Sequence, residues 1–348
     1  MNIKRNFIWL SILIIPGIIP VSAQDDRDDK APVTYEIIYD EPYSVNKLFI
    51  GFQPLYGELF TTNINAGFGM EATYYHKDKF DVKAHFRKTY SKSFYDFNRS
   101  AAALNSQVST KPEIYNYYEL GGTYHIKDFE SESKTKMVLY RASYKGNSWA
   151  ARVPLKAEVP SKLRKIYGAR LGGIVWNSTA DFSRVLEDQG LTNNDLVNDQ
   201  SVGLPLTYID QDGVSQNFSV FGNIYSAGLY TGGSITFIRN TAVSFEGYEG
   251  SVDDGIINIF LDLLYSPLLR VDPVTYQGEE YSAEAIDTRA MGFRVGVDGK
   301  FNRTLSWSYG GELGYRPSIK GSTFFLLMKI CFPIYGTSLD YKVESFGK

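Results

Sequence analysis

The sequence has little of what most catalytic and metal sites are built from. Its 348 residues include one cysteine, Cys331, and three histidines, His76, His85 and His125. A single cysteine excludes an internal disulfide framework, and its alternating apolar surroundings favour a buried side chain over a nucleophile. No Gly-x-Ser-x-Gly motif is present. We therefore expect no enzymatic activity, no catalytic residue, no metal and no cofactor.

Long apolar runs are missing after the first 23 residues. The longest, residues 256–264, is interrupted by Asn258 and Asp262. Because a membrane-spanning helix needs about 20 apolar residues, the rest of the chain could cross a membrane only as strands. The net charge of −3 gives no indication of a nucleic-acid partner.

The N-terminus has the organisation of a secretory signal peptide. Lys4 and Arg5 precede an apolar run at residues 7–19, and Val21 and Ala23 fit the −3 and −1 positions of a cleavage site. We expect cleavage after Ala23, because the run is too short for a membrane anchor. Residues 24–45 begin with an acidic cluster and are predicted to form a flexible periplasmic segment.

The rest of the chain is dominated by two-residue alternation, the period of a β-strand. Residues 321–334 are the clearest case, and similar segments recur back to residue 47. In that stretch one face carries Phe324, Leu326, Met328, Ile330 and Phe332, and the other carries Phe325, Leu327, Lys329 and Cys331. An exported chain of this kind predicts a transmembrane, antiparallel up-and-down β-barrel. Its 26 tyrosines and 22 phenylalanines suit the aromatic girdles of such barrels.

We expect about 12 strands between residues 46 and 334, with 10 to 14 as the range. The segments are 47–55, 63–75, 80–90, 115–126, 136–144, 149–159, 165–176, 223–239, 256–265, 289–300, 305–316 and 321–334. Residues 335–348 form a tail or an extra strand. The longest connections, 91–114, 177–222 and 266–288, are predicted extracellular loops. Helical spacing over residues 180–196 predicts a short helix, in the barrel mouth or at its rim.

Charged residues alternate with the apolar positions and are candidates to line the lumen. They are Glu71, Lys83, His85, Arg87, Glu119, Arg170, Arg294, Asp298, Glu312 and Arg316, with His125, Arg152, Lys156 and Glu158 in the wider set. They could form a solute path or an internal ion-pair network, and the mixture of signs favours the network. We expect Arg170, Arg294 and Arg316 to pair with Glu71, Asp298 and Glu312.

Several stretches resemble Bacteroidetes-type outer-membrane β-barrel proteins, a porin-like and largely uncharacterised group from Gram-negative bacteria. They are Val21-Ser-Ala-Gln24, Ile64-Asn-Ala-Gly-Phe-Gly69, Ile166-Tyr-Gly-Ala-Arg-Leu-Gly172, Gly292-Phe-Arg-Val-Gly-Val-Asp298 and Gly311-Glu-Leu-Gly-Tyr-Arg-Pro317. The resemblance implies an outer-membrane location, assembly by the outer-membrane insertion machinery, and no cofactor. The chain departs from the pattern at its end, because Phe332 is followed by a tail to Lys348.

Two functions are compatible with a barrel in contact with outer-membrane lipid. The first is passive, porin-like transport or a structural role. The alternative is a non-conducting anchor or scaffold subunit of a cell-surface or secretion complex, with a protein partner at the outer loops. A soluble periplasmic β-sandwich, which would bury its apolar faces against each other, is the third interpretation.

Overall fold

The computed structural model describes residues 33–45, 47–61, 63–76, 79–90, 107–139, 155–210, 212–302 and 307–336. The chain divides into two units, Met1–Thr34 and Tyr35–Lys348. Every element below belongs to the second unit. The predicted signal peptide and residues 337–348 of the tail lie outside the described residues.

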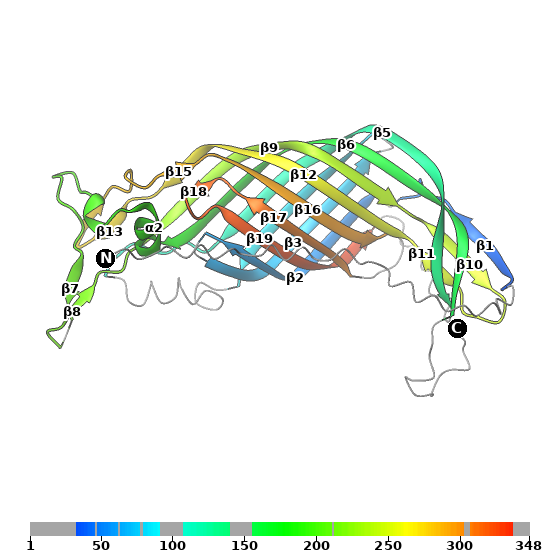
Figure 1. Ribbon diagram of the computed structural model, residues 1–348, viewed down its shortest axis with the longest axis horizontal. Helices are drawn as coiled ribbons and strands as arrows, with labels where there is room; N and C mark the ends of the chain where they lie inside the picture. The colour runs from blue at the N-terminus through cyan, green and yellow to red at the C-terminus, as the bar shows by residue number, and fades with distance from the viewer. Residues whose placement is uncertain are drawn as a thin grey trace, which may run out of the picture. The chain divides into compact units, whose positions relative to one another are not determined.

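Ten antiparallel strands form a closed barrel (Figure 1). Around the barrel their order is β12, β16, β17, β19, β2, β3, β4, β5, β6 and β9. Their bounds are β2 (Leu48–Phe60), β3 (Asn63–His76), β4 (Phe80–Thr89), β5 (Asn116–Leu139), β6 (Leu155–Asp181), β9 (Phe221–Ile238), β12 (Gly255–Val271), β16 (Met291–Phe301), β17 (Ser308–Tyr315) and β19 (Phe324–Gly336). The last strand, β19, pairs with the first, β2, and this pairing closes the sheet.

The barrel has ten strands instead of the expected 12. In two places, a single long strand takes the place of two expected strands. Segment 115–126 and the described part of segment 136–144 fall in β5, and the described part of segment 149–159 and segment 165–176 fall in β6. Residues 127–135, which the expected strands left as a connection, are charged because β5 has left the barrel there. It pairs with β4 only as far as Tyr124, and with β6 as far as Leu139. Beyond the barrel the strand needs no apolar face, so the alternation fades.

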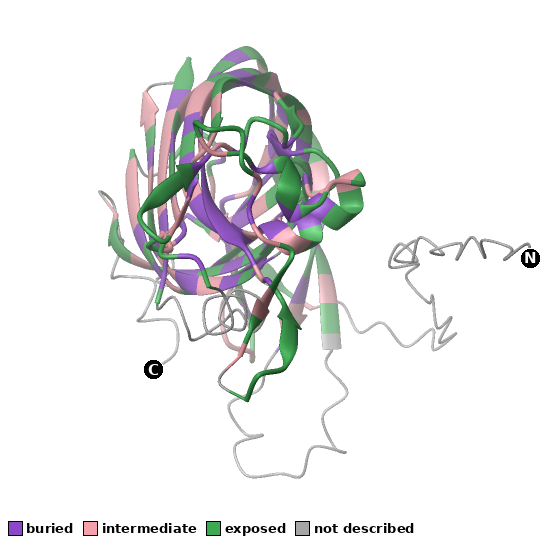
Figure 2. Ribbon diagram, turned by 90° about the vertical axis from the view of Figure 1, so that its left-hand side faces the viewer, coloured by how far each residue is buried: buried purple, intermediate pink, exposed green. Residues whose placement is uncertain are grey.

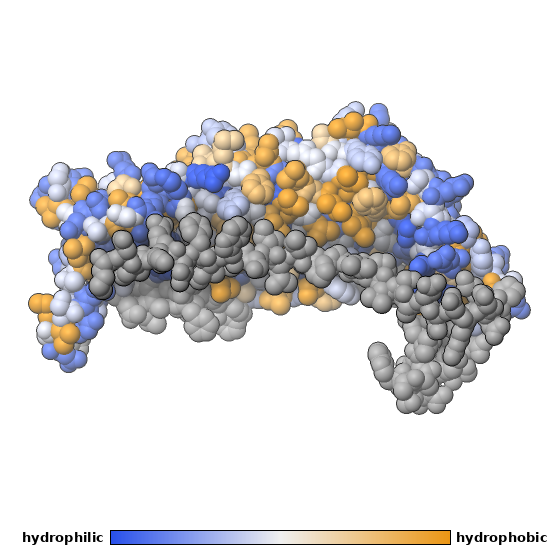
Figure 3. All heavy atoms as spheres, viewed as in Figure 1, coloured by the Kyte–Doolittle hydropathy of each residue, from blue (hydrophilic) through white to orange (hydrophobic). Residues whose placement is uncertain are grey.

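The barrel wall has an apolar outside and a mixed inside, as the alternation predicted. On β19 the side chains of Phe324, Leu326 and Met328 are exposed, whereas those of Leu327 and Lys329 are buried. Apolar residues accordingly gather over the middle of the wall in Figure 3. In the described part of the chain, no helix has the length and apolar character needed to cross a membrane.

At one end of the barrel the long connections fold into an ordered assembly (Figure 2). Its elements are α2 (Phe182–Gln189), the 3₁₀ helix η3 (Asn193–Asp195), β7 (Thr207–Ile209), β8 (Ser215–Asn217), β13 (Val274–Tyr276), β14 (Glu279–Tyr281), β15 (Thr288–Arg289) and β18 (Ser318–Ile319). The expected helix is α2, which begins where Asp181 accepts a hydrogen bond from the Arg184 N–H and ends at Gly190 with φ of 72°. Phe182 and Leu186 of α2 join the buried apolar core that continues into the barrel.

At the other end, the extension of β5 and β6 lies against a small sheet. That sheet contains β1 (Tyr35–Asp40), β10 (Thr241–Phe245) and β11 (Ser251–Asp253). The Thr135 hydroxyl on β5 donates to the Asp253 carboxylate at 2.6 Å, and the Ser251 hydroxyl donates to the Val138 carbonyl at 3.1 Å. Residues 35–40, which belong to the segment expected to be flexible, form β1 and pair with β10.

Candidate functional site

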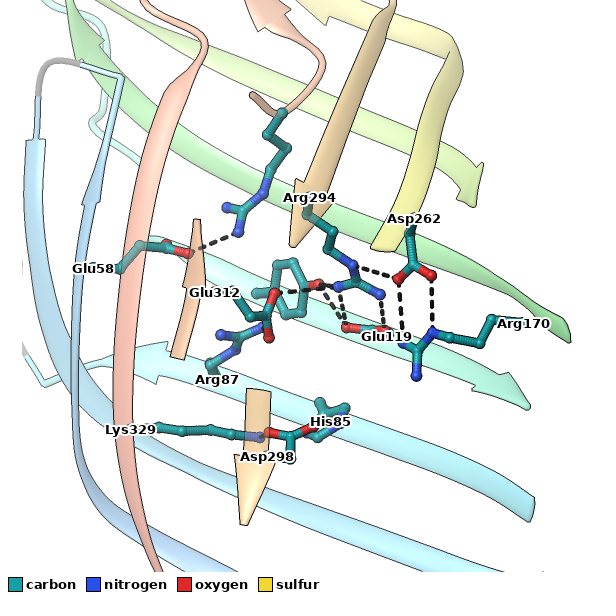
Figure 4. A network of polar contacts seen from close by, with 12 residues as sticks. Glu58, His85, Arg87, Glu119, Arg170, Asp262, Arg294, Asp298, Glu312 and Lys329 are labelled. Atoms are coloured by element: carbon teal, nitrogen blue, oxygen red, sulfur yellow. Dashed lines mark hydrogen bonds and ion pairs between the residues drawn. The ribbon is translucent and has the colours of Figure 1, made fainter. Parts of the chain in front are cut away.

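The most distinctive feature of the barrel interior is a network of ion pairs across the lumen (Figure 4). At its centre is Asp262 on β12, which is fully buried between two arginines. It accepts hydrogen bonds from Arg170 on β6 at 2.8 and 3.2 Å, and from the Nε of Arg294 on β16 at 2.8 Å. One carboxylate thus binds a side chain of β16, which neighbours β12 on one side, and a side chain of β6, which lies beyond β9 on the other side.

Arg294 extends the network to the far wall. Its Nη2 donates to Glu119 at 2.5 Å, and its Nη1 donates to Glu119 at 2.9 Å and to Glu312 at 3.3 Å. Glu119 lies on β5, which is separated from β16 by three strands. The Tyr117 hydroxyl donates to Glu119 at 2.7 Å and accepts from Arg294 at 3.2 Å. We call Glu119, Arg170, Asp262, Arg294 and Glu312 the central network.

Aromatic rings cover the guanidinium groups of this network. Arg170 lies 4.1 Å from the centre of the Phe260 ring, and Arg294 lies 4.5 Å from the centre of the Tyr230 ring. Cation–π contacts of this kind strengthen when water is excluded. The rings also fill space that a pore would leave open.

A second bridge lies next to the central network. Arg316, which follows β17, donates to Glu58 on β2 at 2.8 Å and to the Tyr115 hydroxyl at 3.0 Å. Tyr115 directly precedes β5, which lies opposite β17 in the strand order. This arginine therefore also spans the lumen.

A third group lies around Lys329 on β19. Its ammonium is 3.0 Å from both Glu71 on β3 and Asp298 on β16. Glu71 also accepts a hydrogen bond from Gln53 at 2.9 Å and lies 3.8 Å from His85. A cavity of about 20 Å³ lies beside this group, lined by residues that include Glu71, Lys83, His85, Asp298, Lys300 and Lys329. That volume has room for about one or two water molecules.

Arg87 on β4 differs from the other buried arginines. Its guanidinium is 4.0 Å from the centre of the Tyr117 ring and 3.8 Å from Glu312, which already binds Arg294. None of its three nitrogens has a hydrogen-bond partner among the described residues. It is nevertheless only 1% exposed.

The structure places the ten candidate lumen residues inside the barrel, but most of the expected pairs differ. Of the three arginines expected to pair with Glu71, Asp298 or Glu312, only Arg294 does so, with Glu312. Arg170 binds Asp262, Arg316 binds Glu58, and Glu71 and Asp298 bind Lys329.

Three partners were absent from the candidate list: Glu58, Asp262 and Lys329. Asp262 lies on the same face of β12 as Phe260 and Leu264, so the alternation in residues 256–264 could have placed it inside the barrel. In the wider set, His125 lies 3.2 Å from Asp81 inside the barrel. Lys156 and Glu158 are exposed instead, because they lie on the extension of β6 beyond the barrel. Arg152 lies outside the described residues.

This arrangement is suited to holding the barrel closed, since its charged groups bind one another. The described residues contain no group of three or more histidine, cysteine, aspartate and glutamate side chains arranged to hold a metal ion. The buried Cys331 thiol lies beside the Lys329 group, in the interior row of β19.

No protein-family model and no curated protein matches the chain. Seventeen chains of solved structures match it, among them the CymD monoaromatic hydrocarbon channel. That channel is 9% identical, with a TM-score of 0.23, over 84% of this chain and 89% of its own. A TM-score this low carries no argument about fold or function. The strand pairing alone is the evidence for the barrel fold. The resemblance to Bacteroidetes-type proteins stays a prediction.

Proposed function

We propose that this chain is an outer-membrane β-barrel that its own ion pairs close to solutes, and that it acts as an anchor or scaffold. The observation that carries the proposal is the binding of Arg294. This one side chain makes five hydrogen bonds to Asp262, Glu119, Glu312 and Tyr117, which come from three other strands. A solute would have to separate these groups in order to pass.

The outside of the barrel supports the proposed location. Leu171, Leu263 and Met328 are each at least 60% exposed on different strands, although they are large and apolar. An apolar wall around a polar interior is the pattern of an outer-membrane barrel. A soluble β-sandwich would bury such residues against a second sheet.

The scaffold role is supported by the ordered elements at both ends. The connections at one end share a buried core with the barrel, and the β5–β6 extension at the other end is fixed to the β1–β10–β11 sheet. Rigid surfaces of this kind suit the binding of a protein partner better than mobile loops do. The porin-like alternative predicts instead an interior that water fills across its full width.

Insertion into lipid is tested by comparing two exposed apolar residues. Leu171→Arg on the barrel wall should disfavour insertion by about 2–4 kcal/mol, because a cation near the bilayer midplane is costly. Ile209→Arg at the tip of the β7–β8 hairpin should have little effect, although Ile209 is 75% exposed and Leu171 only 65%. The measurement is the urea dependence of folding into lipid vesicles, with flotation to verify insertion.

The outcomes separate the interpretations. Loss of insertion in Leu171→Arg alone supports a membrane barrel. Equal behaviour of the two variants, or recovery of the wild type as a detergent-free soluble monomer, would contradict it.

A further inference from the structure

The outer wall of the barrel carries a groove of about 560 Å³ that crosses the strands from β2 to β6. The outward-facing residues that line it are Ile50, Met70, Ala72, Ala84, Phe86, Tyr118, Leu120, Gly173 and Val175. Glu71, His85 and Glu119 also border it, but their side chains contact charged groups inside the lumen. The surface that the groove presents is therefore almost entirely apolar. We call it the wall groove.

Three small residues form the floor of the wall groove, because the strand register places them in one row. Ala72 on β3 lies opposite Ala84 on β4. Leu120 on β5 lies opposite Ala84 on one side and Gly173 of β6 on the other. On β3, β4 and β6 this row carries no side chain larger than a methyl group, so the wall is hollow there.

Large side chains form the neighbouring row and give the groove a side. Met70 and Tyr118 both lie opposite Phe86, and Tyr118 also lies opposite Val175. Met70 is 43% exposed and Tyr118 is 51% exposed, so both project from the wall beside the floor. The groove is thus a row of small residues bounded by a row of large ones.

Two successive glycines show that the floor is open space. A Cβ atom at Gly173, which faces outward, would come no nearer than 3.6 Å to the Gly228 carbonyl oxygen. A Cβ atom at Gly172, which faces the lumen, would lie 2.5 Å from the Tyr230 ring. The inner glycine is required by packing, whereas the outer one leaves room that a side chain could fill.

The lining and the dimensions of the groove favour a hydrocarbon chain as its occupant. A polar ligand would lose its hydrogen bonds to water and gain few here. The exposed surface of the groove is far smaller than the about 800 Å² that each partner buries in a stable protein interface. From β2 to β6 the groove crosses four strand spacings, about 19 Å at about 4.8 Å each. One leaflet of the hydrocarbon core is about 15 Å thick, so the groove is long enough for one lipid chain.

We propose that the wall groove binds one acyl chain of a membrane phospholipid, which lies across β3–β6 over Ala72, Ala84 and Gly173. A chain in a groove touches protein on its sides as well as beneath it, and each added contact contributes dispersion energy. This phospholipid is therefore held more firmly than lipid elsewhere on the wall. The inference rests on the proposed function, because only a barrel in a membrane meets such chains.

A matched pair of substitutions tests the site. Ala84→Trp fills the floor of the groove, and Ala169→Trp makes the same change at an exposed position of β6 that does not line it. The full chain is inserted into dioleoyl phosphatidylcholine vesicles and extracted in detergent, and native mass spectrometry counts the phospholipid that it retains. We expect one phospholipid on the wild type and on Ala169→Trp. Ala84→Trp should retain at least about tenfold less, because displacing two methylene groups already lowers affinity by about that factor.

Gly173→Val is a second variant, which narrows the groove on β6 where a Cβ atom fits. It should fold and should also lose the phospholipid. Equal retention by all four proteins, or no phospholipid on a wild type that floats with the vesicles, overturns the lipid site but leaves the closed barrel intact. A dimer of the wild type that Ala84→Trp abolishes would assign the groove to a second copy and also overturns the lipid site. Failure of the wild type to float with the vesicles overturns both proposals.

Discussion

Two arginines in the same lumen, Arg294 and Arg87, are equally buried and differently bound. Each is 1% exposed, yet Arg294 makes five hydrogen bonds and Arg87 makes none to the described residues. Arg294 belongs to the central network on β5, β6, β12, β16 and β17, whereas Arg87 projects from β4 and lies 3.8 Å from Glu312. The comparison shows that burial alone does not identify what holds this barrel closed. Arg294 closes its side of the lumen through direct hydrogen bonds, whereas on the other side the Arg87 guanidinium contributes none to the described residues.

The largest effect should come from the centre of the bonded side. Asp262→Ala leaves Arg170 without its carboxylate and removes one partner of Arg294. An uncompensated buried charge costs about 3–5 kcal/mol, so the free energy of unfolding in detergent or vesicles should fall by about that amount.

The control is an aspartate in an exposed pair. Asp287 lies 2.9 Å from Lys320, and both side chains are two-thirds exposed. Exposed pairs contribute about 0–1 kcal/mol, so Asp287→Ala should unfold like the wild type. Similar losses in the two variants would mean that Asp262 is not the centre of the network.

An intermediate effect is expected where the two sides meet. Glu312 binds Arg294 at 3.3 Å and lies 3.8 Å from Arg87. In Glu312→Ala, Arg294 keeps Glu119 and Asp262, so the loss should be close to that of one charged hydrogen bond, about 1.5–3 kcal/mol. Urea unfolding should rank Glu312→Ala between the wild type and Asp262→Ala. A loss as large as that of Asp262→Ala would contradict the division into two sides.

The smallest effect is expected on the side of Arg87. Arg87→Met keeps an unbranched side chain that replaces the aliphatic part of arginine, and it breaks no hydrogen bond within the described protein, while Glu312 retains Arg294. The free energy of unfolding should change by no more than about 1 kcal/mol. The matched change Arg170→Met removes two hydrogen bonds to Asp262 and should cost more. Equal losses would show that Arg87 is bound as firmly as Arg170.

Much of the barrel could be predicted from the sequence because strands with an apolar outer face and a mixed inner face impose a strict two-residue pattern. Leu326 outside and Lys329 inside follow from that period alone. The strand count could not be predicted in the same way, because β5 and β6 extend beyond the barrel, where the pattern fades.

The interior residues could be predicted better than their partners. Alternation says which face Arg170 and Arg316 occupy, but the pairing depends on which strands lie opposite one another in the closed barrel. The pairs Arg170–Asp262 and Arg316–Glu58 are 92 and 258 residues apart in sequence. Alternation likewise places Lys329 inside, but it does not reveal the contacts with Glu71 and Asp298 that should make this position intolerant of substitution.

Single-channel conductance of the purified protein in planar bilayers tests the closed lumen most directly. The account predicts no stable open-channel steps for the wild type, and steps in Asp262→Ala, in which the central network loses its shared carboxylate. Stable open-channel steps in the wild type, unchanged by Asp262→Ala, would contradict the closed barrel and favour a porin.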